Sequence, residues 1–284
     1  MRARGWLVGL VALVLAPVAL LALPAGAASP TLKPGDKYVA LGSSFASGPL
    51  IPDVADQSCL RSTNNYANIV ARKLKLALTD VSCGASTTAN VVSTPQGVHP
   101  LQIDAVTPDT KLVTVTTGGN DVNYTASNLI CAADGAQGKD CIADGSISPQ
   151  DIHGLLGQVG GKMVGMIEAI QAKAPNARIV VLPYPRVLPP SATPCPPSVP
   201  MQAADLKFML DVSDRLHTAI KNAAKQTKVD FVDSYAPKGH DACASGSKRW
   251  IQGQDPSTTA LTFHPNEAGM QAQAAMILKA LKAK

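Results

Sequence analysis

Short runs of β-forming residues alternate with longer stretches of helical periodicity along most of this 284-residue chain. The β-type runs are apolar at consecutive positions, as expected of strands covered on both faces. Such strands form a parallel sheet with helices packed on its two sides. The sequence therefore predicts an α/β fold. The β-type runs are residues 38–42, 78–82, 111–116, 178–183 and 229–233, and the helical stretches are 64–74, 152–174, 201–226 and 266–282.

Two segments show neither periodicity, residues 122–150 and 184–200, and each contains cysteine. They could be plain surface loops or walls of a cleft, and the sequence leaves both interpretations open. No period of 20–50 residues repeats, which excludes solenoids and propellers.

The first 27 residues have the composition of an export signal. Two arginines precede an apolar run over residues 7–23, and a small-residue pattern ends at Ala27. We expect residues 1–27 to be removed as a signal peptide and residues 28–284 to form one secreted domain. The alternative is an uncleaved anchor, for which the run is short and interrupted by proline.

The charge balance excludes some classes of partner. The formal net charge is +5, and two of the arginines lie in the leader. No basic cluster occurs, and aromatic residues make up only 4% of the chain. Nucleic-acid binding normally needs a basic face or an aromatic platform. We therefore expect no nucleic-acid partner. No other stretch of the sequence approaches the length of a membrane span, so we expect no stable membrane insertion, and we also expect a monomer.

Six cysteines follow the predicted leader. An even number behind an export signal indicates three disulfides in an oxidising compartment, with 15 possible pairings. A metal site is disfavoured, because the chain contains no C-x-x-C pair. Pairing of nearest neighbours is the simplest interpretation: Cys59–Cys83, Cys131–Cys141 and Cys195–Cys243.

Small or polar residues follow three of the predicted strands and open the last helix. Ser44 follows the first strand, Gly84 the second and Asn120 the third, and His264 precedes the C-terminal helix. Each alone has a structural explanation, such as a turn glycine or a helix-entry residue. Sites in parallel sheets gather at the carboxyl ends of the strands, however, so we expect these residues to meet.

Their order resembles the four signature blocks of the SGNH hydrolases, a branch of the GDSL-type esterases and lipases. The segment Tyr38-Val-Ala-Leu-Gly-Ser-Ser-Phe-Ala-Ser-Gly48 is similar to the first block, and Gly118-Gly-Asn-Asp121 to the third. His264-Pro-Asn266 is similar to the fourth. The segments Cys59-Leu-Arg-Ser62 and Tyr184-Pro-Arg186, with the six-cysteine layout, look like the actinobacterial secreted esterases, lipases and phospholipases.

The resemblance implies a fold and a chemistry. The fold would be a three-layer α/β/α sandwich with a five-stranded parallel sheet, flavodoxin-like in order. Ser44 would attack a carboxylic ester with His264 as general base, forming an acyl-Ser44 intermediate without metal or cofactor. The negative charge on the carbonyl oxygen would meet the N–H groups of Ser44 and Gly84 and the side-chain amide of Asn120.

Signatures of other hydrolases and of nucleotide-binding proteins are absent from the sequence. The chain has no G-x-S-x-G elbow, no H-E-x-x-H zinc motif and no G-x-x-x-x-G-K-[ST] phosphate loop. These absences disfavour an α/β-hydrolase, a zinc hydrolase and a nucleotide-binding protein.

The sequence departs from the family pattern at two positions. Ser43 stands where the family has Asp before the nucleophile, and Leu261 stands where it usually has the triad Asp. We therefore expect a Ser44–His264 dyad in which the Leu261 carbonyl accepts from the imidazole. The competing hypothesis is that Asp255 folds back as the acid.

Several assignments stay open at this point. Asp121 is expected to brace the turn beside Asn120, and Arg61 could bind a substrate phosphate or serve a structural role near Cys59. The expected substrates are lipid or short-chain acyl esters. The alternatives are a carbohydrate deacetylase and a non-catalytic lipid- or glycan-binding protein on the same fold.

Overall fold

The computed structural model describes residues 31–255 and 259–282. Its centre is a five-stranded sheet in the order β4-β1-β5-β6-β7, and every neighbouring pair in it is parallel. This is the flavodoxin-like order, so the predicted fold class is confirmed. The strands are β1 (Lys37–Gly42), β4 (Ala77–Asp80), β5 (Leu112–Thr116), β6 (Arg178–Val181) and β7 (Asp230–Phe231).

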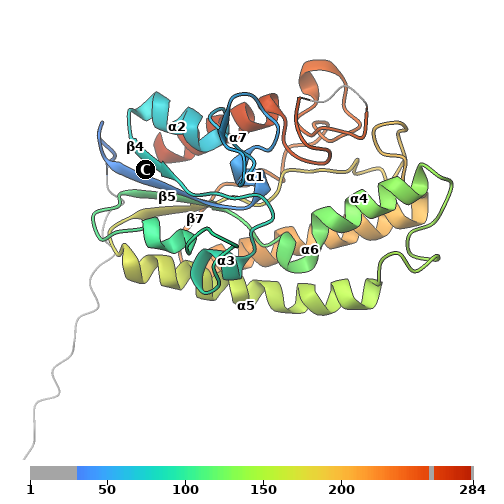
Figure 1. Cartoon of the computed structure of the whole chain (residues 1–284), viewed down its shortest axis with the longest axis horizontal. Helices are drawn as coiled ribbons and strands as arrows, with labels where there is room; N and C mark the ends of the chain where they lie inside the picture. Colours follow the sequence, from blue (N-terminus) through green and yellow to red (C-terminus); the bar gives the residue numbers. More distant parts are fainter. Residues whose placement is uncertain (1–30, 256–258, 283–284) are drawn as a thin grey trace, which may run out of the picture.

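Helices cover both faces of this sheet and complete three layers (Figure 1). One face carries α2 (Tyr66–Leu74) and α7 (Glu267–Lys282), and the other carries α5 (Pro149–Lys173) and α6 (Ala203–Gln226), which pack along each other. Local sequence sets two of the starts. Asn65 caps α2 through its side chain, and Ser148 caps α5 ahead of a proline at the first helical position.

Alternate residues of β1 serve two separate cores. Tyr38 and Ala40 pack with apolar residues of α2 and α7, whereas Val39 and Leu41 pack with those of α5 and α6. All four are buried. Burial on both faces explains why this strand is apolar at consecutive positions.

The segment 122–150, which the sequence left without structure, contains a twelve-residue helix, α4 (Tyr124–Gly135). Its periodicity is weak because Tyr124, Thr125, Ser127, Asn128, Cys131 and Ala132 are all buried, so polar side chains occupy inward positions. The second such segment, 184–200, contains no named helix or strand, but Tyr184, Val187 and Leu188 are buried in the core, so the interpretation as a plain surface loop is wrong for this part. The shorter elements are α1 (Ser44–Ser47), β2 (Val54–Asp56), β3 (Arg61–Ser62), α3 (Thr88–Val92), η1 (Gln102–Ala105), η2 (Asn120–Val122) and η3 (Gly246–Lys248).

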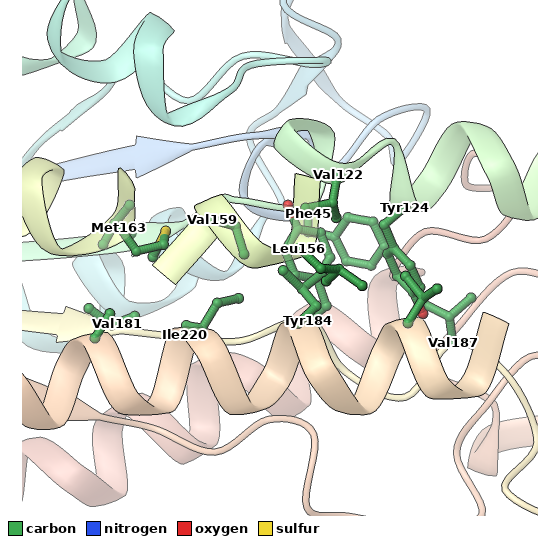
Figure 2. Close-up of a cluster of buried hydrophobic side chains, with 14 of the residues drawn as sticks. Phe45, Val122, Tyr124, Leu156, Val159, Met163, Val181, Tyr184, Val187 and Ile220 are labelled. Carbon is green, nitrogen blue, oxygen red and sulfur yellow. The ribbon is translucent and has the colours of Figure 1, made fainter. Parts of the chain in front are cut away.

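A cluster of aromatic rings fills the core next to the carboxyl ends of β1 and β5 (Figure 2). The rings of Phe45 and Tyr184 meet edge-on with centroids 4.4 Å apart, and Tyr184 meets Tyr124 at 5.9 Å. All three rings are buried. Burial of rings of this size fixes α1 and the loop after β6 relative to each other.

The described residues contain three disulfides: Cys59–Cys83, Cys131–Cys141, in which Cys131 belongs to α4, and Cys195–Cys243. These are the nearest-neighbour pairs. Within residues 31–255 and 259–282, no helix is both long and apolar enough to span a bilayer. The predicted signal peptide, residues 1–27, lies outside the described residues.

Candidate active site

A tight turn after β1 brings Ser44 to the carboxyl edge of the sheet. Gly42 ends the strand with φ 137°, and a Cβ there would lie 2.3 Å from the Thr116 carbonyl oxygen of β5. Only glycine fits so close an approach. The Gln102 side chain holds the turn, accepting from the Gly42 N–H at 2.7 Å and donating to its carbonyl at 3.0 Å. Ser44 is then the first residue of α1.

Ser44 and Asn120 follow adjacent strands, β1 and β5. The strand order reverses here, because β1 has the second strand of the sheet on one side and the third on the other. Open α/β sheets bind ligands outside the carboxyl ends of the strands at this switch point. The fold therefore places Ser44 and Asn120 at the edge of the sheet where the sequence predicted a site.

Ser43, which replaces the family's Asp, is buried. Its N–H donates to the Thr116 carbonyl at 2.8 Å, and its hydroxyl lies 3.1 Å from the Tyr184 hydroxyl. Tyr184 in turn accepts from the Gly119 N–H at 2.9 Å. Position 43 thus links the turns that follow β1 and β5 through one tyrosine.

His264 reaches Ser44 from the loop before α7, although the two lie 220 positions apart. Its Nε2 is 2.8 Å from Ser44 Oγ. The loop pairs with Gln252, which donates to the His264 carbonyl at 2.9 Å and accepts from the Phe263 N–H at 2.8 Å. The Phe45 ring packs against the imidazole at 4.8 Å between centroids. These contacts hold the imidazole beside the serine.

The other imidazole nitrogen contacts a main-chain carbonyl, but not the one expected. His264 Nδ1 lies 2.9 Å from the carbonyl oxygen of Thr262. The prediction of Leu261 is wrong, because the Leu261 carbonyl accepts the backbone N–H of His264 at 3.0 Å. A carbonyl can only accept, so Nδ1 carries the proton and Nε2 is left to accept from the Ser44 hydroxyl.

Asp255, the competing candidate for the acid, has other partners. Its carboxylate accepts from the Ser198 hydroxyl and forms an ion pair with Arg249. Burial raises the pKa of Asp255, but the bonds from Ser198 and Arg249 outweigh it and hold that pKa below its ordinary value. The prediction that Asp255 turns back onto the imidazole is therefore wrong for this structure, because both of its oxygens serve a junction between two loops.

The imidazole is almost completely enclosed, with an exposed fraction of 2%. Burial lowers the pKa of His264 to about 4, and the hydrogen bond to the Thr262 carbonyl raises it only in part. With no carboxylate beside it, the imidazole stays neutral, the form that can accept a proton from a hydroxyl.

Two hydrogen-bond donors near the Ser44 hydroxyl have no acceptor among the described residues and are free to bind a ligand. Asn120 donates one amide hydrogen to the Ser86 carbonyl at 2.8 Å and keeps the other unpaired among the described residues. The Ser44 N–H, the first of α1, has no intrahelical acceptor. Asp121 accepts from the N–H and hydroxyl of Thr88 at 2.9 and 2.6 Å, which braces the turn beside Asn120.

Gly84 differs from the expectation. Its N–H donates to the Cys59 carbonyl at 2.8 Å, so the prediction that this amide is a free donor is wrong here. The cause is the Cys59–Cys83 disulfide, which draws the Cys59 backbone against the turn. The Gln96 amide also donates to the Gly84 carbonyl, at 2.7 Å.

In the described part of the chain, two groups of side chains have a spacing that could suit a metal ion. Each contains two cysteines, one pair with His99 and the other with Asp205. Both pairs of cysteines are joined in disulfides, which leaves no thiolate to act as a ligand.

Comparison with known proteins places this geometry in a family. Residues 40–272 match the model of the GDSL-like Lipase/Acylhydrolase family. The chain belongs to this family.

This GDSL-like acylhydrolase has close relatives among bacterial lipases. It is 38% identical to Lipase 2 of Streptomyces coelicolor over 92% of this chain and 90% of the relative. It is 30% identical to Lipase 1 of the same organism over 90% of this chain and 91% of that relative. Family and relatives together identify it as a carboxylic ester hydrolase that acts on small-molecule esters.

Solved structures share the fold of this GDSL-like acylhydrolase. The extracellular lipase of Streptomyces rimosus aligns with a TM-score of 0.71 at 22% identity, covering 87% of this chain and all of that one. Phospholipase A1 of Streptomyces albidoflavus aligns with a TM-score of 0.66 at 23% identity, over 88% of this chain and all of that one. The three disulfides of this chain are consistent with an oxidising compartment.

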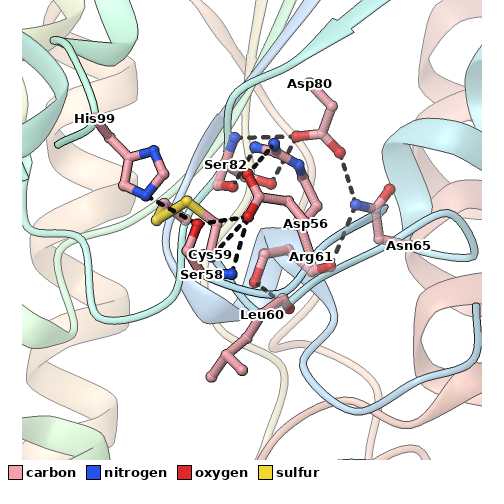
Figure 3. Close-up of polar contacts among 11 residues, drawn as sticks. Asp56, Ser58, Cys59, Leu60, Arg61, Asn65, Asp80, Ser82 and His99 are labelled. Atoms are coloured by element: carbon pink, nitrogen blue, oxygen red, sulfur yellow. Dashed lines mark hydrogen bonds and ion pairs between the residues drawn. A yellow bond between two sulfur atoms is a disulfide. The ribbon is translucent and has the colours of Figure 1, made fainter. Parts of the chain in front are cut away.

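A second serine–histidine contact in this GDSL-like acylhydrolase has a different character (Figure 3). Ser58 Oγ lies 3.1 Å from His99 Nε2, but it donates its proton to Asp56 at 2.6 Å. His99 must then donate to Ser58, so the imidazole does not accept the proton of this hydroxyl.

Arg61, for which the sequence left two roles open, bonds within the protein. Its guanidinium donates to the Ser82 carbonyl at 2.8 Å and to Asp56 at 3.0 Å (Figure 3). These contacts favour the structural role.

Sequence reasoning missed Thr262 and Gln102. The first acts through its main chain, which any residue type can supply, so no signal marks it. The second lies 60 residues from the turn that it holds, and only the paired donor and acceptor of its amide suit it to both groups of Gly42.

Proposed function

We propose that this enzyme hydrolyses carboxylic esters through an acyl-Ser44 intermediate, with His264 as general base and no acidic third residue. The observation that carries the proposal is the 2.8 Å contact between Ser44 Oγ and His264 Nε2. The Thr262 carbonyl on Nδ1 supports it, since that contact fixes the tautomer needed for proton transfer.

In the first half of the reaction, the Ser44 oxygen bonds to the ester carbonyl carbon while its proton passes to His264 Nε2. The oxygen of the tetrahedral intermediate accepts hydrogen bonds from the Ser44 N–H and the free amide hydrogen of Asn120. Each such donor lowers the barrier by roughly 2.7–4 kcal/mol. The carbon–oxygen bond to the alcohol then breaks, and His264 returns the proton to the leaving alkoxide.

In the second half, His264 takes a proton from water, and the resulting hydroxide attacks the acyl-Ser44 carbonyl. The bond to Ser44 breaks, the serine oxygen regains the proton, and the carboxylic acid leaves. The carbonyl of Thr262 orients the imidazole throughout but offers only a partial charge to the imidazolium. The dyad is therefore expected to be slower than a full triad.

We further propose lipid or short-chain acyl esters as substrates. The curated relatives named lipases support this substrate class. In this proposal residues 28–284 act as one monomeric domain, released to the extracellular space or cell envelope once residues 1–27 are removed.

The test is the turnover of p-nitrophenyl esters by the wild type, Ser44→Ala and Ser58→Ala. Wild type and Ser58→Ala should hydrolyse the esters, and Ser44→Ala should lose activity by about 10⁴-fold or more. Ser58 is the matched control, because it too contacts an imidazole. Equal activity of Ser44→Ala and wild type, or no activity in any of the three proteins, would contradict the proposal.

A further inference from the structure

An apolar cleft lies at the end of α1, the short helix that Ser44 begins, and is lined by the segment between α1 and α2. Its volume is about 290 Å³, and its apolar lining comes from Leu50, Ile51, Val54 and Leu60. We propose that this cleft, here called the leucine cleft, binds the unbranched acyl chain of the ester. The inference rests on the proposed function and states in addition which part of the substrate the enzyme selects.

The leucine cleft is built from the segments that carry the proposed catalytic residues. Gly48, which lines the cleft, ends α1, and its N–H donates to the Ser44 carbonyl at 3.0 Å. The cleft therefore begins one helical turn beyond the serine. The next residue, Pro49, accepts from the Leu261 N–H at 3.1 Å, which ties this segment to the loop of His264.

Leu60 connects the cleft with the turn that precedes α3. A Cβ added to Gly84 would lie 3.5 Å from Leu60 Cδ1, so this side chain stands against that turn as well as the cleft. The Ser86 carbonyl, two residues further on, accepts from Asn120. A chain lying along Leu60 can thus extend from the cleft towards the turn that Asn120 contacts.

Apolar exposure is concentrated at this cleft. Leu50, Val54 and Leu60 are 54%, 65% and 40% exposed, and they are three of the six large apolar side chains exposed in the described residues. Both leucines have a left-handed backbone, with φ 64° and 50°. This conformation is uncommon for a side chain of that size, and such strain gathers at ligand sites.

Polar contacts hold Leu60 rigidly while its side chain extends away from them (Figure 3). The Leu60 carbonyl accepts from the Ser47 hydroxyl of α1 at 3.2 Å, and its N–H donates to the Gln57 carbonyl at 3.2 Å. On either side, Cys59 is anchored by its disulfide and Arg61 by Ser82. An apolar surface fixed in advance loses little entropy when a flexible chain binds to it.

The chemistry of the lining selects a hydrocarbon chain. Among the described residues, Arg61 is the only charged one that lines the cleft, and its guanidinium is already bound to Ser82 and Asp56. A sugar would leave most of its hydroxyls without partners here, at a cost in affinity. The volume lies at the lower end of the range for ligand pockets, about 300–1,000 Å³, which suits a chain of moderate length.

The test is kcat/KM for p-nitrophenyl acetate, hexanoate and decanoate, all below their critical micelle concentrations. Wild-type kcat/KM should rise with chain length, by up to about fourfold for each methylene buried. Leu60→Ala and Leu60→Asn should each lower the decanoate-to-acetate ratio by about tenfold. Asn tolerates the left-handed backbone, so it removes the apolar surface without strain.

Val98→Ala is the matched control, because Val98 is 93% exposed and does not line the cleft. It should leave the ratio unchanged. A ratio that is the same in the Leu60 variants and the wild type would overturn the inference. The inference would also be overturned if the Leu60 variants changed only the preference among acetate esters of different alcohols. The same holds if they changed activity only on aggregated lipid.

Binding of decanoate to Ser44→Ala, measured by calorimetry, separates this inference from the proposed function. Adding Leu60→Asn to Ser44→Ala should weaken binding by about tenfold, whether or not the wild type hydrolyses any ester. Equal binding by the two proteins would overturn the leucine cleft. Full turnover by Ser44→Ala would overturn only the assignment of Ser44 as the nucleophile.

Discussion

At the scale of single residues, the environment of His264 determines how the enzyme responds to acid. Burial lowers the pKa of His264 to about 4, whereas an exposed histidine titrates near 6.5. A general base must be neutral, and kcat/KM reports the free enzyme. We therefore predict that kcat/KM stays near its maximum down to about pH 5 and is halved at about pH 4.

The control for this pH profile is the folded fraction, followed by circular dichroism at each pH. The unfolded chain takes up the imidazole proton near pH 6.5 and the folded chain only near pH 4. The unfolded state therefore binds more protons between these values, and stability falls by about 3 kcal/mol as the pH decreases through them. An acid limb centred near pH 6.5 in protein that is still folded would contradict the account.

Asp255 gives a second prediction at this scale. Asp255→Asn should keep kcat/KM within about threefold of the wild type, because the carboxylate binds Arg249 and Ser198 and not the imidazole. Loss of the ion pair should lower the free energy of unfolding by about 1–3 kcal/mol. Steady-state kinetics and denaturant unfolding measure the two effects. A fall in turnover of a thousandfold in folded protein would show that Asp255 acts as the acid.

At the scale of elements, the apolar runs and helical periods of the sequence predicted all five strands of the main sheet and four helices. They failed at α4, where buried polar side chains mask the period, and at the short β2–β3 pair, which covers only three and two residues. Tertiary packing stabilises both, and no local pattern encodes it.

The candidate site was predictable to a similar degree. Residue types at strand ends indicated Ser44 and Asn120, and the residue type before the last helix indicated His264, because their chemistry requires particular side chains. The sequence did not predict the acceptor for Nδ1 or the occupied amide of Gly84. Both depend on the direction of a main-chain group. The left-handed backbone conformation of Phe263 sets the first, and the disulfide at Cys59 sets the second.

Arg178 joins three elements and supplies a prediction at their scale. Its buried guanidinium pairs with Asp230 of β7 at 2.5 Å and donates to the Ala280 and Leu281 carbonyls at the end of α7. Breaking a buried pair costs about 3–5 kcal/mol. Arg178→Ala should lower the free energy of unfolding by this amount, with little change in the kcat/KM of the folded enzyme.

Lys37→Ala is the control for Arg178→Ala. Lys37 also pairs with an aspartate, Asp109, but both side chains are more than half exposed. Exposed pairs contribute about 0–1 kcal/mol. Urea unfolding of both variants compares the two costs, and equal losses would refute the role given to Arg178.

At the scale of the whole molecule, one disulfide connects stability with substrate preference. Cys59–Cys83 closes a loop of 24 residues and anchors Leu60, whereas Cys131–Cys141 lies in the α4 region. Replacing either pair with alanine should cost about 3 kcal/mol by loss of loop closure. Only the Cys59→Ala/Cys83→Ala variant should also lose preference for decanoate over acetate. An equal preference for decanoate in both variants would show that the Cys59–Cys83 disulfide does not hold the leucine cleft in place.

The account depends most on the identity of the nucleophile, and covalent labelling tests it directly. The enzyme is treated with a p-nitrophenyl alkylphosphonate, which stays bound to the attacking oxygen, and the labelled peptide is sequenced by mass spectrometry. We predict one adduct per chain, on Ser44, in the wild type and far slower labelling in His264→Ala. An adduct on Ser43, Ser47 or Ser58, or continued hydrolysis of esters by protein that carries the label on Ser44, would contradict the account.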